Sequence, residues 1–331
     1  MGATQKISKT AQCELCPRGC VLDEGQKGNC RARTNKDGKI ITLVYGKPCA
    51  VHVDPIEKKP LYHFLPASKA YSIGTAGCNL HCKNCQNWEI SQSEPEKTNN
   101  IDLPPLEAVS RAAGSGCKSI AYTYNDPVVF YEYMCDIAKI ARPRGIRSVA
   151  VTAAYINPEP LAELCSTIDA IKVDFKGITE EFYSKVCFGR LQPVLDSLKT
   201  IKKSGCWLEL VNLVIPTLND GADDISRLVD WVLDNLGADV PLHFSRFWPQ
   251  YQLRELPPTP EATLDAAWKA AKDKGVKFAY IGNIARHDGN NTYCPKCGKL
   301  LIKRAGYDVM ENNIAGGGCK FCGQKIPGIW E

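Results

Sequence analysis

Three cysteines in the stretch Gly77-Cys-Asn-Leu-His-Cys-Lys-Asn-Cys85 constrain this chain more than any other feature. They form a CxxxCxxC pattern directly after the apolar-leaning run of residues 70–75. Three thiolates cannot close a four-coordinate metal site, but a catalytic metal site needs one position that stays open for water or substrate. In a cubane iron-sulfur cluster, three cysteines bind three irons and leave the fourth iron free. The pattern therefore predicts a 4Fe-4S cluster held by Cys78, Cys82 and Cys85.

A zinc knuckle completed by His81 or by a distant thiol is the structural alternative for this loop. Zinc sites favour two CxxC-like pairs, and His81 lies beside Cys82, where ligation by both residues would be strained. A redox relay built on CxxC pairs is a third interpretation, and it predicts reversible dithiols. The spacing favours the iron-sulfur cluster over both.

Cysteine usage also indicates metal ligation for the chain as a whole. The sequence has 17 cysteines in 331 residues, most of them in pairs and triplets, and 44% of its residues are hydrophobic. A long, core-rich chain whose N-terminus MGATQKISKTAQC has no apolar leader is a poor candidate for a disulfide framework. We therefore expect a cytoplasmic protein, and the lack of a long apolar run argues against a membrane partner. A net charge of +5 without charge runs argues against nucleic acid.

Residues 67–286 alternate short apolar strands with segments of helical period, which is typical of repeated βα units and a parallel sheet. This pattern predicts an α/β fold, a partial (β/α)6-type barrel, with a doubly wound open sheet as the alternative. The expected strands are 70–75, 119–124, 148–152, 170–175, 208–215, 242–247 and 277–281. The expected helices are 106–113, 128–141, 160–167, 194–203, 223–236 and 261–274.

Two smaller cysteine-rich modules are expected to flank the barrel. Residues 1–66 contain Cys13, Cys16, Cys20 and Cys30, which would hold zinc or an auxiliary iron-sulfur cluster, and one apparent strand at 39–45. Residues 287–331 carry two CxxC knuckles, with little apolar sequence between them, and would need a metal to fold. The four thiols of these knuckles, Cys294, Cys297, Cys319 and Cys322, predict a closed zinc-ribbon site, with rubredoxin-like iron as the minor alternative.

The cysteine loop at the start of a βα repeat resembles the radical S-adenosylmethionine (SAM) superfamily. More narrowly, the chain resembles the pyruvate formate-lyase activating enzyme-like branch and, within it, the radical SAM component of the AmmeMemoRadiSam system. The resemblance extends over nearly the whole chain and adds an ordered set of motifs to the loop. These are CELCPRGC from Cys13, EKKPLYHF from Glu57, CQNW from Cys85, YTYNDP from Tyr122, VDFK from Val173, and the closing CPKCG and CKFCG pairs.

The resemblance implies that the amino and carboxylate groups of SAM chelate the free iron. One electron from the reduced cluster then cleaves the sulfonium C–S bond, and the resulting 5′-deoxyadenosyl radical abstracts hydrogen from a substrate. The expected partners are a low-potential donor, flavodoxin-like or ferredoxin-like, and a substrate. That substrate is either a protein, as in activation of a glycyl-radical enzyme, or a small molecule.

The resemblance also assigns residues at the strand ends to the SAM pocket. Asn125 and Asp126 match the segment that holds the methionyl ammonium, although Asp126 before Pro127 is also an ordinary helix start. Thr152 matches a threonine near the carboxylate, but Ala153-Ala154 replaces the Asn-Gly that follows it in relatives.

Asp174 and Lys176 form an Asp-x-Lys pair at the end of the fourth strand and are the expected catalytic residues, with Asp174 also near SAM. Period two directs both to the same face, although a surface ion pair is the alternative. Asn84 stands where the superfamily often has an aromatic residue beside adenine, and Trp88 is expected to serve instead. Trp248 precedes Pro249, where relatives commonly have a histidine before the proline, so the polar contact expected from that histidine is lost.

A non-enzymatic binding module with several zinc ions is the function of a different class that the cysteine pattern also allows. An iron-sulfur protein is brown, whereas a zinc protein is colourless, so colour separates the two. The remaining cysteines stand singly. Cys187, which follows the Asp-x-Lys strand, is the one nearest to the expected open face, although a free cysteine is usually a small buried hydrophobe.

Overall fold

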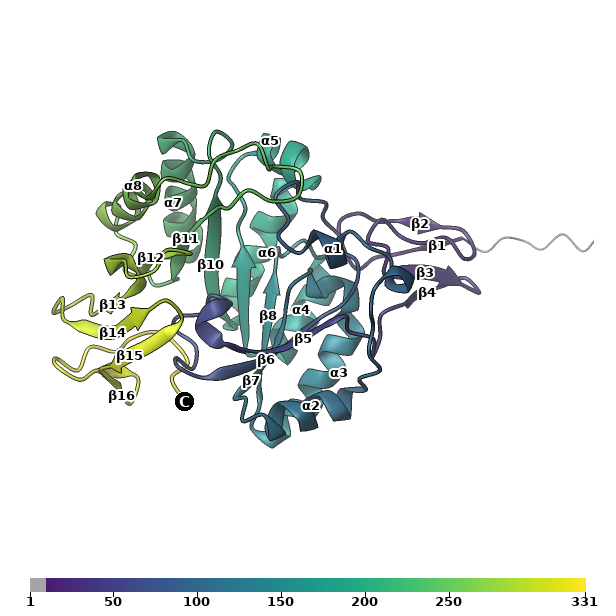
Figure 1. The fold of residues 1–331 in the computed structure, drawn as a ribbon, viewed down its shortest axis with the longest axis horizontal. Coiled ribbons are helices and arrows are strands. Elements are labelled where there is room, and N and C mark those ends of the chain that lie inside the picture. Colours follow the sequence, from purple (N-terminus) through teal and green to yellow (C-terminus); the bar gives the residue numbers. More distant parts are fainter. Residues whose placement is uncertain (1–9) are drawn as a thin grey trace, which may run out of the picture.

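A computed structural model describes residues 10–331. Its centre is an eight-stranded sheet with the order β12-β11-β10-β9-β8-β7-β6-β5, as Figure 1 shows. Strands β6 to β12 run parallel, whereas β5 pairs with β6 in the antiparallel direction. The strands are β5 (Ala50–Pro55), β6 (Lys69–Gly74), β7 (Ser119–Tyr122), β8 (Arg147–Thr152), β9 (Ala170–Asp174), β10 (Trp207–Val214), β11 (Leu242–Arg246) and β12 (Ala279–Gly282).

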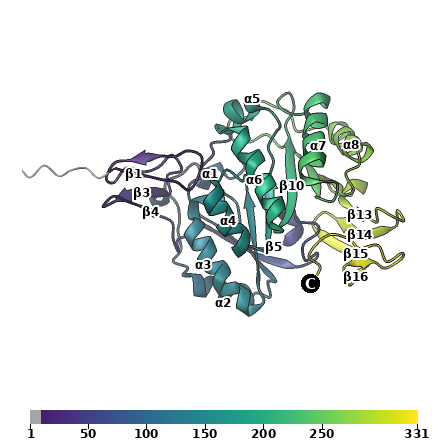
Figure 2. The same cartoon turned by 180° about the vertical axis from the view of Figure 1, so that it is seen from behind.

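One long helix follows each parallel strand up to β11 and covers the outer face of the sheet (Figure 2). These helices are α2 (Pro105–Gly114), α3 (Tyr131–Ala141), α4 (Pro158–Thr167), α6 (Leu191–Ser204), α7 (Ala222–Leu236) and α8 (Glu261–Asp273). The sequential strand order and the helices on one face confirm the partial barrel and exclude the doubly wound sheet. The short helices α1 (Trp88–Ser91) and α5 (Glu180–Phe182) and the π-helical turn Tyr183–Cys187 were not predicted, because so few residues show no clear period.

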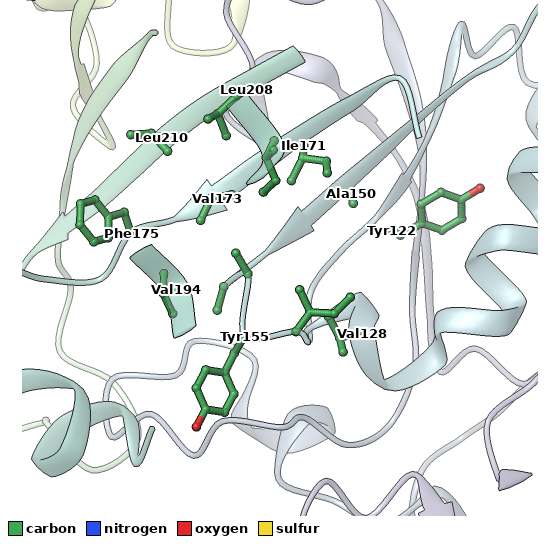
Figure 3. Packing of buried hydrophobic residues seen from close by; sticks show 14 of the residues in the cluster. Tyr122, Val128, Ala150, Tyr155, Ile171, Val173, Phe175, Val194, Leu208 and Leu210 are labelled. Atoms are coloured by element: carbon green, nitrogen blue, oxygen red, sulfur yellow. The ribbon is translucent and has the colours of Figure 1, made fainter. Parts of the chain in front are cut away.

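The main hydrophobic core lies between the strands and the outer helices. On β9, Ile171 and Val173 face this core, and Figure 3 shows them packed beside Ala150 and Val194. The alternate residues of β9 point the other way, into the barrel, because successive strand side chains face opposite sides. Polar residues on these strands therefore line the interior of the barrel.

A second, smaller core closes the barrel at the N-terminal ends of its strands. Ala70, Ala121 and Ala170 are fully buried there against Phe64 and Ile56 of the segment that precedes β6. The small alanines leave room for this segment inside the barrel. The barrel interior is therefore closed at the N-terminal ends of its strands. A ligand has to enter through another part of the barrel.

The N-terminal segment is built of short hairpins and contacts the barrel on the side opposite the C-terminal module (Figure 1). Its strands are β1 (Ala11–Gln12), β2 (Val21–Leu22), β3 (Arg33–Lys36) and β4 (Lys39–Thr42). The strand expected at 39–45 is present as β4, but it is not the only strand of this segment, because β1, β2 and β3 precede it. The turn Asp37-Gly38, with φ of 54° and 77°, joins β3 to β4, and Asp-Gly is a typical hairpin signal.

The C-terminal module contains β13 (Thr292–Tyr293), β14 (Leu300–Ala305), β15 (Asp308–Asn312), β16 (Ile314–Ala315) and β17 (Gly318–Cys319). Its final residues return to the barrel, where Ile329 exchanges backbone hydrogen bonds with His63 and Leu65. Within residues 10–331, no helix is long and apolar enough to cross a membrane.

Candidate active site at the open end of the barrel

The three-cysteine loop leaves the C-terminal end of β6 and is fixed by its neighbours. Asn125 donates a hydrogen bond from Nδ2 to the carbonyl oxygen of Gly77 at 2.7 Å, and Gly77 donates its N–H to Ile90 at 2.9 Å. On the far side of the loop, Lys83 donates its N–H to Val186 at 2.9 Å. Asn125 therefore holds the loop from the end of the neighbouring strand β7.

His81 points away from the three thiols. Its Nε2 lies 2.6 Å from Oδ1 of Asn29, and its Nδ1 lies 2.7 Å from Oε1 of Gln92. Both ring nitrogens are thus engaged with amide side chains, one of them in the N-terminal segment. This arrangement removes the support for a zinc knuckle completed by His81.

Cys78, Cys82 and Cys85 line one cavity in the barrel interior. Its volume is about 460 Å³. Ligand pockets usually hold roughly 300–1,000 Å³, so this cavity has the size of a ligand pocket. The lining also includes Asn84, Asn125, Asp126, Thr152, Lys172, Asp174, Lys176, Ser245, Asn283 and Tyr307.

Asp174 lies between two lysines on the inner face of β9. Its carboxylate contacts Nζ of Lys172, and Nζ of Lys176 lies 3.8 Å from it. Burial alone would raise the pKa of Asp174, but the positive charges of Lys172 and Lys176 outweigh it and lower the pKa below its ordinary value. Burial lowers the pKa of Lys172, against the effect of Asp174. The pair predicted from the sequence is therefore part of a charged triad in the cavity wall, with Lys172 buried and Asp174 and Lys176 partly exposed.

Asp126 and Thr152 come from neighbouring strand ends and contact each other at the cavity wall. Thr152 donates its hydroxyl to Oδ1 of Asp126 at 2.9 Å, and the N–H of Ala153 donates to Oδ2 at 2.9 Å. Asp126 also accepts the N–H of Val128, so it starts a short 3₁₀ helix as the alternative interpretation anticipated. Ala154 has a φ of 54°, the left-handed conformation that suits the glycine of relatives.

Asn84 lies between the second and third cysteines and is buried. Its Oδ1 has no hydrogen-bond partner among the residues that the structure describes. An unpaired buried amide oxygen is costly, so this atom fits a donor from a bound molecule in the cavity. The residue is thus better placed for a polar contact than for the stacking that its aromatic counterpart would give.

Trp88 and Trp248 make other contacts. The Trp88 ring stacks on the Tyr251 ring, with 5.2 Å between the ring centroids. Trp88 is not among the described residues that line the cavity. Trp248 is 47% exposed and packs its ring against the guanidinium of Arg246. The sequence signal for both rings was weak, because a tryptophan stacks in many settings.

The sequence analysis missed several polar residues of the interior. Lys172 precedes Asp174 by two residues, so the period of two that paired Asp174 with Lys176 contained the signal. Asp54 of β5 accepts hydrogen bonds from Lys59 at 2.6 Å and from the Tyr124 hydroxyl at 2.8 Å. Nothing in the sequence near Asp54 marks it, because β5 was not expected to join the barrel.

The four C-terminal thiols form the tightest metal-binding group. Cys294 lies 3.6 Å from Cys322, and Cys297 lies 3.8 Å from Cys319, measured between sulfurs. Within residues 10–331, no other group of His, Cys, Asp or Glu side chains gathers around a single point in this way. These four residues come from two separate CxxC knuckles, and together they could hold a metal ion.

The sequence is similar to known proteins. The profile of the radical SAM superfamily matches residues 72–232. An uncharacterised protein of Methanocaldococcus jannaschii is 44% identical over 95% of this chain and 94% of its own length. The chain belongs to the radical SAM superfamily.

Within that superfamily, pyruvate formate-lyase-activating enzyme of Clostridium pasteurianum is 21% identical over 46% of this chain and 65% of its own length. Among solved structures, a radical SAM methyltransferase from Sphaerobacter thermophilus gives a TM-score of 0.51 at 13% identity. The match covers 72% of this chain and 71% of that chain, and it supports the radical SAM barrel as the fold.

Membership in the radical SAM superfamily implies a 4Fe-4S cluster and SAM, and the cavity residues fit both groups. Three thiols, of which that of Cys82 is buried and the other two are partly buried, reach one cavity from a single loop, and no fourth thiol is among its described lining residues. Asn84, whose Oδ1 has no partner among the described residues, lines the same cavity. A cluster bound through three irons and a polar ligand at the fourth match these observations.

Proposed function

We propose that this protein is a radical SAM enzyme that reductively cleaves SAM. The observation that carries the proposal is that Cys78, Cys82 and Cys85 line the same cavity as the Lys172–Asp174–Lys176 triad. When bound, the cluster and SAM supply one-electron cleavage to methionine and a 5′-deoxyadenosyl radical that abstracts hydrogen from a substrate. The rest of the chemistry is positioning by the chain.

Each polar residue of the cavity has a proposed task. Asn84 accepts a hydrogen bond from SAM, and the Asp126 and Thr152 pair fixes the strand ends that face its methionyl group. Asp174 and Lys176 orient the substrate or the ribose, with Lys172 holding the Asp174 carboxylate in place. Asn125 acts on the cysteine loop through the carbonyl of Gly77. The segment that closes the barrel at the N-terminal ends of its strands excludes water from that side.

The C-terminal module is proposed to hold zinc. Four sulfurs at about 2.3 Å from one zinc ion lie about 3.8 Å apart, and this is close to the two sulfur distances observed. Because its ligand set is complete, this zinc has a structural task.

The test uses protein that is purified without oxygen, reconstituted with iron and sulfide, and reduced with dithionite in the presence of SAM. Mass spectrometry of 5′-deoxyadenosine and methionine should find both products in equal amounts. The Cys82→Ala variant should give neither. Cys165→Ala is the matched control, because Cys165 is half-buried on α4 and outside the cavity lining, and it should keep full product yield. A colourless protein without iron would contradict the proposal and favour the multi-zinc binding module.

The substrate and donor are tested in a second step. We propose a flavodoxin-like or ferredoxin-like donor, and either a partner protein or a small molecule as the source of hydrogen. Deuterated candidates that transfer label into 5′-deoxyadenosine identify the substrate. Label transfer only in the presence of a protein partner would support an activase-like reaction.

A further inference from the structure

A second group of four thiols surrounds a separate cavity in the N-terminal segment. It is lined by Cys13, Cys16, Cys20 and Cys30, and the first two and the last of these are buried. The remaining lining is mostly apolar, with Leu15, Leu22, Val128 and Val129 among it.

The spacing of these thiols differs from that of a zinc site. The C-terminal thiols converge on one point, but within the described chain no such convergence occurs at Cys13, Cys16, Cys20 and Cys30. One zinc ion requires its four sulfurs to be mutual neighbours. In a cubane cluster each thiolate binds a different iron, so the four sulfurs stand farther apart around a shared volume. Four thiols that line one cavity without converging on a point match the needs of a cluster better than those of one zinc ion.

An unpaired donor at the cavity wall points to an anionic occupant. Arg33 is 6% exposed, and its Nη atoms bind Glu132 at 2.8 and 2.5 Å. Its Nε is buried and has no hydrogen-bond partner among the described residues. A 4Fe-4S cluster with four thiolates is an anion whose sulfurs accept hydrogen bonds, so it would satisfy the unpaired Nε donor.

We propose that Cys13, Cys16, Cys20 and Cys30 bind a second 4Fe-4S cluster, complete in protein ligands and therefore closed to SAM. The second cluster lies beside the first. The carbonyl oxygen of Cys30 is directly against Gly77, which precedes Cys78, and Asn79 of the same loop lines the N-terminal cavity. This proposal goes beyond SAM cleavage and does not depend on it, because it concerns ligation by a different segment.

The deciding experiment removes the first cluster and counts what remains. In the triple variant Cys78→Ala, Cys82→Ala, Cys85→Ala, reconstituted without oxygen, we expect about four iron and four sulfide per chain. The protein should stay brown, and its reduced form should give an electron paramagnetic resonance signal that does not respond to SAM. A triple variant that contains zinc in the place of iron and sulfide would overturn the proposal. The iron and sulfide content of the triple variant does not depend on SAM cleavage. A wild-type protein that fails to cleave SAM would therefore leave this expected content unchanged.

Arg33 supplies a second measurement that does not require removing a ligand. In the same triple background, Arg33→Gln should keep the iron content and shift the midpoint potential to a more negative value, because a positive charge no longer favours the reduced cluster. Lys36→Gln is the matched control, because Lys36 is an exposed cation on the same strand, β3, and does not line the cavity. An unchanged potential in Arg33→Gln would place the cluster elsewhere and contradict the proposed ligation.

Discussion

Gly77 is the residue at which the two cysteine-rich parts of the chain meet. Its φ is 87°, and a Cβ at this position would lie 2.3 Å from the carbonyl oxygen of Cys30. A side chain is therefore excluded by both conformation and space. The loop of Cys78 can lie this close to Cys30 only because residue 77 has no Cβ.

Gly77→Ala should therefore displace the cysteine loop and lower the iron content and product yield of the reconstituted protein. Gly116→Ala is the control, because Gly116 has a φ of 67° but no atom within 4 Å of its added Cβ. The control should lose only about 1–2 kcal/mol from the left-handed backbone conformation. Iron analysis and thermal unfolding measure the two effects, and equal losses in both variants would contradict the close-contact argument.

Asp174→Asn should leave Lys172 and Lys176 beside each other without a counter-charge. We expect a loss of about 2 kcal/mol in the free energy of unfolding, less than for a fully buried pair because Asp174 is partly exposed. SAM cleavage should fall by at least about tenfold, which corresponds to 1.4 kcal/mol. Glu181→Gln breaks the exposed pair with Lys185 and should leave both quantities unchanged. Full activity in Asp174→Asn would remove Asp174 from the proposed site.

Residues of the site could be predicted from the sequence only where a local spacing encodes them. The CxxxCxxC loop and the Asp-x-Lys pair have such spacings, and the structure brings both to one cavity. Tyr307 reaches the site from a distant segment, and no local pattern links this residue to the site. The unpaired Nε donor of Arg33 was also not predicted, because it is significant only beside the thiols that the fold brings around it.

Whole elements were predicted where their period repeats over enough residues. All seven parallel strands lie close to their expected positions, because buried apolar runs between capped helices give a strong signal. The strands β1 and β2 have two residues each and give no period. β5 was missed for another reason. It contains His52 and Asp54 and lacks the apolar run of a buried strand, and its pairing with β6 is a property of the tertiary fold.

The segment between β5 and β6 is joined to the end of the chain by His63. Its Nδ1 lies 2.7 Å from the carbonyl oxygen of Pro327, and its Nε2 lies 2.6 Å from the Tyr280 hydroxyl. A carbonyl oxygen can only accept a hydrogen bond, so Nδ1 carries the proton of the neutral ring. Nε2 therefore accepts a hydrogen bond from the Tyr280 hydroxyl. Burial lowers the pKa of His63 from 6.5 to about 4, against the opposing effect of Glu209.

Stability should therefore fall as the pH is lowered from about 6.5 to 4. In this range the unfolded chain binds a proton at His63 and the folded chain does not, so acid favours unfolding by up to about 3 kcal/mol. Thermal unfolding of His63→Gln should depend less on pH across this window. His52→Gln, at an exposed site on β5, should behave as the wild type. Equal pH dependence in all three proteins would show that His63 is not the responsible group.

Removal of the C-terminal metal should unfold the module that contains β13 to β17. This element has little apolar sequence, so the metal provides much of its stability. Cys319→Ser, or treatment with a chelator, should release one metal ion, and backbone amides of the module should exchange hydrogen faster. Cys117→Ser, at a buried cysteine outside the module, should keep the metal. Unchanged exchange in Cys319→Ser would mean that the module folds without a metal.

At the scale of the whole molecule, Arg304 ties the C-terminal module to the barrel. Its Nη2 donates to the carbonyl oxygen of Tyr62 at 2.8 Å, its Nη1 donates to the Thr292 hydroxyl at 2.9 Å, and its guanidinium lies 3.9 Å from the Tyr62 ring. Arg304→Met keeps much of the volume but leaves these acceptors unpaired, so it should cost about 2–3 kcal/mol. Lys303→Met, on the exposed face of β14, should cost less than about 0.5 kcal/mol. Chemical denaturation measures both, and equal costs would remove Arg304 from this role.

The return of the chain end to the barrel floor has a practical consequence. Ile329 is hydrogen-bonded beside Phe64, at the N-terminal ends of the strands, whereas the cysteine loop leaves their C-terminal ends. A linker fused after Glu331 would start at the floor and lead away from the cavity. The protein can therefore be immobilised on an electrode or sensor chip through its C-terminus, with the entrance to the barrel facing solution.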